Sequence, residues 1–164
     1  MGHLKHIIIT IFLFTNFCFG NIKFSAESLV LDFPSTIVAS GNATFSENLI
    51  DISSNRFSYD TKTLYGTFDK NVIINYLKST LKGDSFSLDI SKRFILGRGN
   101  IVFLTDDIKA YADNLTIKNY EILVLKNNVS IQQNGNQIQS NELMYNLKTD
   151  TILSNERVKL KIED

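Results

Sequence analysis

The sequence is poor in the residues that carry most enzyme chemistry. It has two histidines, one cysteine and no tryptophan among 164 residues, and His3, His6 and Cys18 all lie within the first twenty positions. Beyond residue 20 there is therefore no disulfide, no thiol nucleophile and no imidazole to act as a general base. Serine and lysine are plentiful, but no spacing singles out a Ser-Lys pair. We predict that the protein is not an enzyme and expect neither a cofactor nor a metal ion.

An excess of charge of either sign is also lacking. Seventeen Lys and Arg residues balance seventeen Asp and Glu residues. Such a chain has no basic field that would hold a phosphate backbone, so we expect no nucleic-acid partner. The adjacent acids Asp106-Asp107 are interpreted as a loop, because neighbouring side chains on a strand point to opposite faces. Lys92-Arg93 and Arg98 are expected in solvated turns, with contact to lipid phosphates as the alternative.

The only long hydrophobic run lies at the start of the chain. Residues 7–19 are apolar except for two threonines and one asparagine, Lys5 precedes them and the small residue Gly20 follows. Thirteen residues fall well short of the roughly 20 that cross a bilayer as a helix. The layout predicts a secretory signal peptide over residues 1–20, with an uncleaved anchor as the alternative, and a single domain over residues 21–164. Export without disulfides favours a bacterial periplasm.

What the sequence does contain is a repeat of 28 or 29 residues. An apolar position recurs at this spacing in five copies: Leu29, Phe57, Phe86, Leu115 and Leu143. A second position keeps the same spacing: Asn42, Asn71, Asn100, Asn128 and Arg157. A fixed period of this length predicts stacked units, none of which buries its apolar face alone.

Each copy has the pattern of two short strands. In the best copy, Phe86 and Leu88 alternate with serines, a polar bend follows at residues 91–93, and the return strand carries Gly97-Arg98-Gly99-Asn100. The glycines are expected where a bulge needs positive φ. Strands of about six residues between polar turns predict an all-β fold of five two-strand copies, a sandwich, a barrel or a roll.

The aligned copies place like side chains in columns, so the stack should enclose a continuous apolar trough. The same residues could fill a closed core instead of a groove. The strongest candidates for a groove are aromatic and aliphatic residues of the central copies: Phe57, Tyr59, Phe68, Phe86, Leu88, Ile101, Phe103, Leu115 and Ile117.

Three pairs of segments carry a resemblance to a known family. They are Leu29-Val30-Leu31-Asp32 with Ala39-Ser40-Gly41-Asn42-Ala43, Phe57-Ser58-Tyr59-Asp60 with Tyr65-Gly66-Thr67-Phe68, and Phe86-Ser87-Leu88-Asp89 with Gly97-Arg98-Gly99-Asn100-Ile101. An apolar-x-apolar-Asp bend with a glycine-rich return resembles the OstA-like domain family, over essentially the whole chain beyond residue 20. Copies four and five lack the Gly-x-Gly-Asn step, so the trough is expected to be less regular there.

The resemblance implies an antiparallel β-jellyroll, open along one side, that carries lipopolysaccharide from the inner to the outer membrane. Its partners would be the lipid A acyl chains and other OstA-like domains, one anchored in the inner membrane and one in the outer-membrane translocon. These domains, and further copies of this chain, would join head to tail by edge-strand pairing. The alternatives are an inner-membrane-anchored member of the family and a closed β-scaffold that binds proteins and carries no lipid.

Overall fold

The computed structural model describes residues 17–19, 21–32, 34–133, 135–153 and 159–161, and these contain no helix. They form one antiparallel sheet of thirteen strands, which confirms the all-β jellyroll prediction. The first strands are β1 (Phe17–Phe19), β2 (Ile22–Ser25), β3 (Ser28–Asp32), β4 (Thr36–Glu47), β5 (Ile50–Asp60) and β6 (Tyr65–Tyr76). The others are β7 (Ser79–Asp89), β8 (Phe94–Leu104), β9 (Ile108–Lys118), β10 (Ile122–Gln133), β11 (Asn136–Asn146), β12 (Thr151–Leu153) and β13 (Lys159–Lys161).

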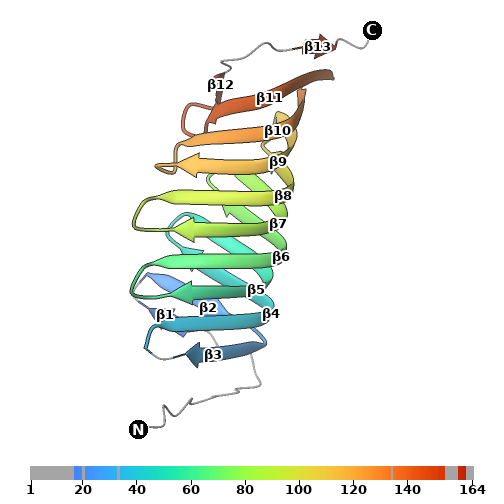
Figure 1. Ribbon diagram of the computed structural model, residues 1–164. Helices are drawn as coiled ribbons and strands as arrows, with labels where there is room; N and C mark the ends of the chain where they lie inside the picture. The colour runs from blue at the N-terminus through green and yellow to red at the C-terminus, as the bar shows by residue number, and fades with distance from the viewer. Residues whose placement is uncertain (1–16, 20, 33, 134, 154–158, 162–164) are drawn as a thin grey trace.

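The order of the strands in space follows the chain. From β4 to β11 each strand pairs with the next through a tight turn. Figure 1 shows the result, a tall stack in which the chain climbs from β3 at one end to β11 at the other. Local pairing of this kind is what a repeat of two-strand units produces, because each unit buries its apolar face against its neighbours.

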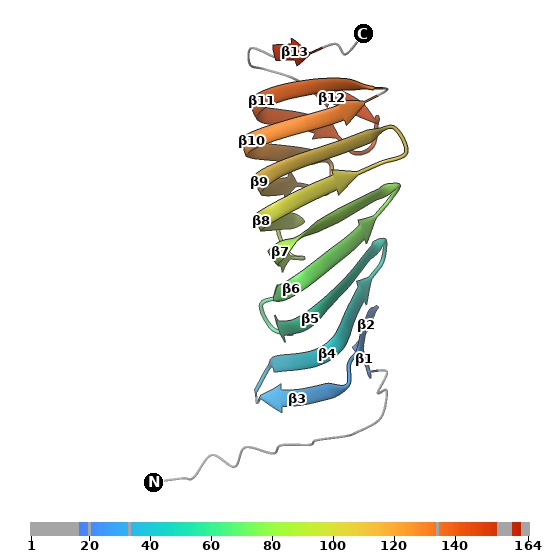
Figure 2. The ribbon, with the colours of Figure 1, turned by 90° about the vertical axis from the view of Figure 1, so that its right-hand side faces the viewer.

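The long strands have 11 or 12 residues, so the expectation of about six was wrong. Each continues through a bulge, where the register of the ladder shifts. At each bulge of β4, β6, β8 and β10 two consecutive residues have positive φ, between 44° and 74°: Gly41-Asn42, Lys70-Asn71, Gly99-Asn100 and Asn127-Asn128. A bulge bends its strand. The sheet therefore folds over into two layers, which join on the right in Figure 1 and are seen from that side in Figure 2.

The bulge explains the recurring asparagine. Asparagine tolerates the left-handed region better than other residues that carry a Cβ atom. In copy four, where the glycine is missing, Asn127 takes its place with φ 64°. The expected loss of regularity in copy four is therefore not seen at the bulge.

The two ends of the stack differ from the prediction. The single strand expected over residues 21–33 is divided into β2 and β3, and both pair with β4. The last return is β12 and β13, both paired with β11, and residues 154–158 between them lie outside the described residues. Of the predicted signal peptide only 17–19 are described; they pair with β2 as β1, and the rest lies outside the described residues.

Candidate functional site

The interior of the roll is the candidate site, because it collects every residue predicted for the trough. The nine residues come from β5 to β9, and each is at most 3% exposed. All of them belong to one continuous hydrophobic cluster. The structure thus brings the whole predicted set together, but as a core filled by side chains.

The character of the interior changes along the stack. Toward the N-terminal end five aromatic rings pack with centroids 5.3–6.3 Å apart: Phe24, Phe45, Phe57, Tyr59 and Phe68. Toward the C-terminal end the buried residues of β9 and β10 are mostly aliphatic. Phe24 was missed as a site residue, because it lies in the divided first strand and matches no column of the repeat.

Phe86, at the centre, occupies space that two glycines leave open. It is paired with Gly97 across the ladder between β7 and β8. A Cβ atom at Gly97 would lie 2.5 Å from Phe86 Cε1, and one at Gly83 would lie 2.9 Å from Phe86 Cε2. Gly99 has the expected positive φ of 74°, whereas Gly97 is required because Phe86 lies against it.

The polar groups inside the roll are tyrosine hydroxyls. The Tyr59 hydroxyl is buried without a hydrogen-bond partner among the described residues, and burial raises the pKa of Tyr59 to about 12. The Tyr145 hydroxyl donates to Asp150, and burial raises the pKa of Tyr145 as well. Groups with pKa values this high stay protonated near neutral pH, so the interior offers apolar contact and no general base.

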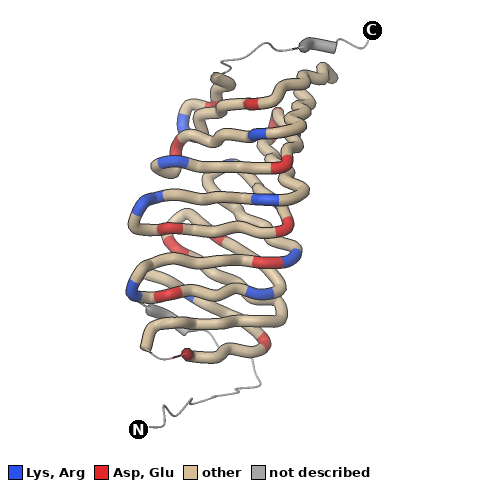
Figure 3. The backbone as a smooth tube through the Cα atoms, viewed as in Figure 1, with Lys and Arg blue, Asp and Glu red and all other residues tan. Residues whose placement is uncertain are grey.

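Two rows of turns border the roll. We call the turns at residues 48–49, 77–78 and 105–107 the first lip, and those at 61–64, 90–93, 119–121 and 147–150 the second lip. Because the strands bend between them, the lips face each other along a line that we call the seam. Along the second lip each turn accepts a backbone hydrogen bond from the next, as Arg93 O does from Tyr120 N at 3.2 Å. Figure 3 shows charged residues of both signs along this lip, at the left.

The aspartates that end the first strand of a copy build the turns of the second lip. Asp89 accepts hydrogen bonds from Ser91 Oγ at 2.6 Å and Lys92 N at 3.0 Å, and Lys92 Nζ lies 2.9 Å from its other oxygen. These hydrogen bonds lower the pKa of Asp89 to about 2. Asn146 makes the same turn in copy five, accepting from Lys148 N and Thr149 N.

The basic residues considered for lipid phosphates are not brought together. Lys92-Arg93 lies in the second lip, whereas Arg98 lies beside the bulge of β8, where the sheet bends. Asp106-Asp107 lies in the loop between β8 and β9, as predicted. Within the described part of the chain no group of three or more acidic, histidine or cysteine side chains is placed to hold a metal ion.

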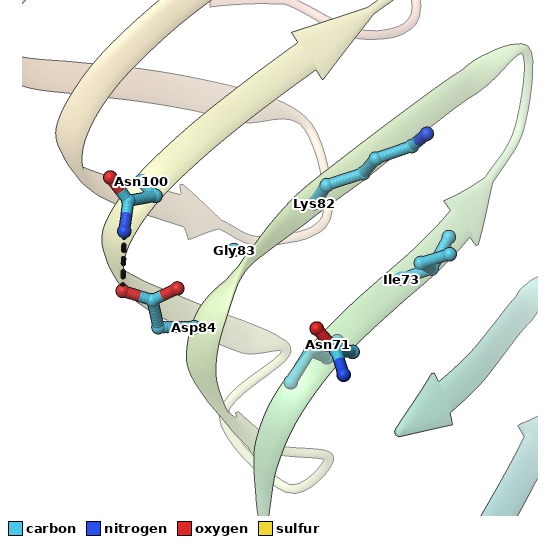
Figure 4. A pocket seen from close by; sticks show the side chains of 7 residues that line it. Asn71, Ile73, Lys82, Gly83, Asp84 and Asn100 are labelled. Carbon is cyan, nitrogen blue, oxygen red and sulfur yellow. Dashed lines mark hydrogen bonds between the residues drawn. The ribbon is translucent and has the colours of Figure 1, made fainter. Parts of the chain in front are cut away.

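A pocket of about 240 Å³ lies at the bend of the sheet, on β6, β7 and β8. Its lining includes Asn71, Lys82, Asp84 and Asn100, and Asn100 Nδ2 donates to Asp84 Oδ2 at 2.8 Å (Figure 4). None of the nine trough residues lines it. One lysine beside a carboxylate that is already hydrogen-bonded is not a catalytic arrangement.

Comparison with known proteins places these features in a family. Residues 51–151 match the family described as "LptA/(LptD N-terminal domain) LPS transport protein". Among the described residues no helix is long and apolar enough to cross a membrane. No curated protein is a significant match to the sequence.

A solved structure supports the fold. LptH of Pseudomonas aeruginosa, described as the LptA homologous periplasmic component of the lipopolysaccharide transport device, matches with a TM-score of 0.61 at 15% identity. The match covers 70% of this chain and 95% of LptH. Since the family match spans more than half of the 164 residues, this chain belongs to the LptA/LptD N-terminal domain family of lipopolysaccharide transport proteins, the OstA-like proteins.

Proposed function

We propose that this protein carries lipopolysaccharide through the periplasm, with the acyl chains inside the roll and the sugars outside the seam, and catalyses no reaction. The observation that carries the proposal is the continuous apolar interior, which runs from β2 to β11 beside a seam bordered by turns. Each methylene moved from water into such an interior gains about 0.8 kcal/mol. A lipid with several acyl chains would therefore cross an aqueous compartment at a much lower cost inside the roll than outside it.

Uptake requires the roll to rearrange. The nine trough residues are at most 3% exposed, so acyl chains have to part the lips and take the place of side-chain contacts. Interiors that are filled by side chains have no spare volume for a ligand. We therefore expect binding to be accompanied by separation of the lips.

Binding of a fluorescent fatty acid by the purified protein tests the proposal, with unlabelled lipopolysaccharide as competitor. Leu88→Ala enlarges the interior and should change the affinity, whereas Ser87→Ala, at the neighbouring position on the other face of β7, should not. Circular dichroism shows whether each variant keeps its sheet. Absence of binding by the folded wild-type protein would refute the proposal.

The packed interior also favours a second candidate, a closed β-scaffold that offers its edges to protein partners. The prediction that separates the two concerns β3, which among the described strands pairs only with β4. An edge strand is a template for another sheet. In the transport proposal this edge joins further copies of the chain, or LptC-like and LptD-like domains, head to tail.

Proline at Val30, in the middle of β3, should abolish this assembly while fatty-acid binding continues. Assembly of the wild-type protein without any lipid binding would favour the scaffold. The remaining alternative, an LptC-like protein anchored in the inner membrane, differs in the fate of residues 1–20. Amino-terminal sequencing of the exported protein distinguishes a mature chain that starts at Asn21 from one that keeps the hydrophobic run.

A further inference from the structure

One contact crosses the seam directly. Tyr76, at the end of β6 beside the first lip, donates a hydrogen bond from its hydroxyl to the backbone carbonyl of Tyr120 in the second lip, at 2.8 Å. The two rings also pack, with centroids 5.9 Å apart. The residues are 44 positions apart, so this contact joins different copies of the repeat.

Arg93 completes the contact from the outside. Its guanidinium carbon lies 5.5 Å from the centre of the Tyr120 ring, and its backbone carbonyl accepts from Tyr120 N. A guanidinium over an aromatic face is attracted to the ring. Tyr120 is therefore held by three groups at once: the Tyr76 hydroxyl, the Arg93 guanidinium and the Arg93 carbonyl.

The closed arrangement is costly at the same place. Tyr120 has φ 56° and Leu77, which follows Tyr76, has φ 54°, and bulky residues seldom adopt the left-handed region. The Tyr120 hydroxyl is buried without a partner among the described residues. Backbone strain and an unsatisfied buried hydroxyl both favour opening, so the contact holds together two lips that are under strain.

Exposed apolar side chains lie beside this contact on the first lip. Leu77 is 45% exposed, and Leu49 in the preceding turn of the same lip is 64% exposed. Successive turns of one lip are two strands apart, about 10 Å at the usual strand spacing. An acyl chain that reaches the first lip from solvent would thus find two leucines next to the crossing contact.

We propose that Tyr76, Tyr120 and Arg93 form a latch across the seam, and that acyl chains enter or pass the middle of the roll only when this latch opens. The inference rests on the proposed transport function. It follows from one requirement: a lipid whose acyl chains lie inside and whose sugars lie outside spans the seam, and no such molecule moves past a closed crossing contact. The latch would therefore set the rate of uptake.

Tyr76→Phe tests the latch with little change in packing, because it removes the hydrogen bond and keeps the ring. Loss of one neutral hydrogen bond from the closed state corresponds to a two- to ten-fold change in the opening equilibrium. We expect the rate of fatty-acid uptake, measured by stopped flow, to rise two- to ten-fold. Tyr111→Phe, at a half-buried tyrosine of β9 away from both lips, is the matched control and should leave the rate unchanged.

A covalent lock tests the opposite direction. Cysteines replace Tyr76 and Tyr120 in a Cys18→Ser background, and a short bifunctional thiol reagent joins them. The locked protein should lose fatty-acid uptake, and the same variant left unlinked should retain it and so serve as its own folding control. If the double variant does not fold, the uptake rate of Tyr76→Phe decides alone.

The outcomes separate this inference from the function beneath it. If the folded wild-type protein binds no fatty acid and no lipopolysaccharide, the transport proposal falls and the latch with it. If the wild type binds lipid but neither the lock nor Tyr76→Phe changes the uptake rate, the latch is refuted and the transport proposal stands. Slower uptake by Tyr76→Phe would equally overturn the latch, because the hydrogen bond would then assist entry.

Discussion

Replacing Gly97 by alanine probes how closely the centre of the roll is packed. The added Cβ atom would lie 2.5 Å from Phe86 Cε1 and 3.0 Å from Ile101 Cδ1, and both side chains are at most 3% exposed. Neither can turn toward solvent, so the strain has to be absorbed by off-rotamer side chains or by a shift of β8. Overpacking of this kind costs about 1–3 kcal/mol. The backbone of Gly97 does not have a positive φ, so the whole effect comes from the contact.

Urea denaturation of the wild type, Gly97→Ala, Phe86→Leu and the double variant measures that contact. Phe86→Leu alone leaves space and destabilises the protein, but it also removes the atoms that the new methyl group meets. The double variant should therefore be more stable than the sum of the two single effects predicts, by about 1 kcal/mol or more. Gly135→Ala is the matched control, because its Cβ atom meets nothing within 4 Å and its cost comes only from φ 79°. Wild-type stability of Gly97→Ala, or strictly additive effects in the double variant, would refute the packing described for Phe86.

Three further substitutions test the turns and the bulges. Asp89→Asn should lower the melting temperature at pH 7; the carboxylate's contribution is complete above its unfolded pKa of about 4 and is lost as the pH falls toward about 2, so the two proteins should converge in acid, and a constant difference down to pH 2 would contradict this. Lys70→Gly should stabilise the protein by about 0.5–1 kcal/mol in urea denaturation, because Lys70 has φ 63°, and destabilisation would show that the strain is not there. Asn100→Ala should cost about 1 kcal/mol in the same assay, since it removes both a residue suited to φ 48° and the hydrogen bond to Asp84, and wild-type stability would contradict the structural role of the recurring asparagine.

The repeat made much of this fold predictable. A period of 28 or 29 residues places Phe57, Phe86 and Leu115 at equivalent positions, and like positions in stacked units share one environment. All three are buried in the same interior. The positive φ of Gly99 was also predictable, because a glycine followed by asparagine inside a strand is typical of a bulge.

Other features do not follow from the period. Strand lengths were underestimated because a bulge interrupts the alternation of apolar and polar residues, so one bent strand of 11 residues resembles two shorter ones. The contact of Tyr76 with Tyr120 spans one and a half copies, and no column pairs such positions. Whether the interior is a core or a groove depends on how far the lips separate, and the same apolar residues serve both.

Photo-crosslinking from position 86 is the most direct test of lipid transport through the interior. A photoreactive amino acid replaces Phe86 in one strain and the neighbouring Ser87 in another, in cells that carry labelled lipopolysaccharide. We predict a lipid adduct from position 86 and none from position 87, because only the first side chain points into the roll. Absence of an adduct from position 86, and from position 57 in the same interior, would contradict the account and leave a closed β-scaffold.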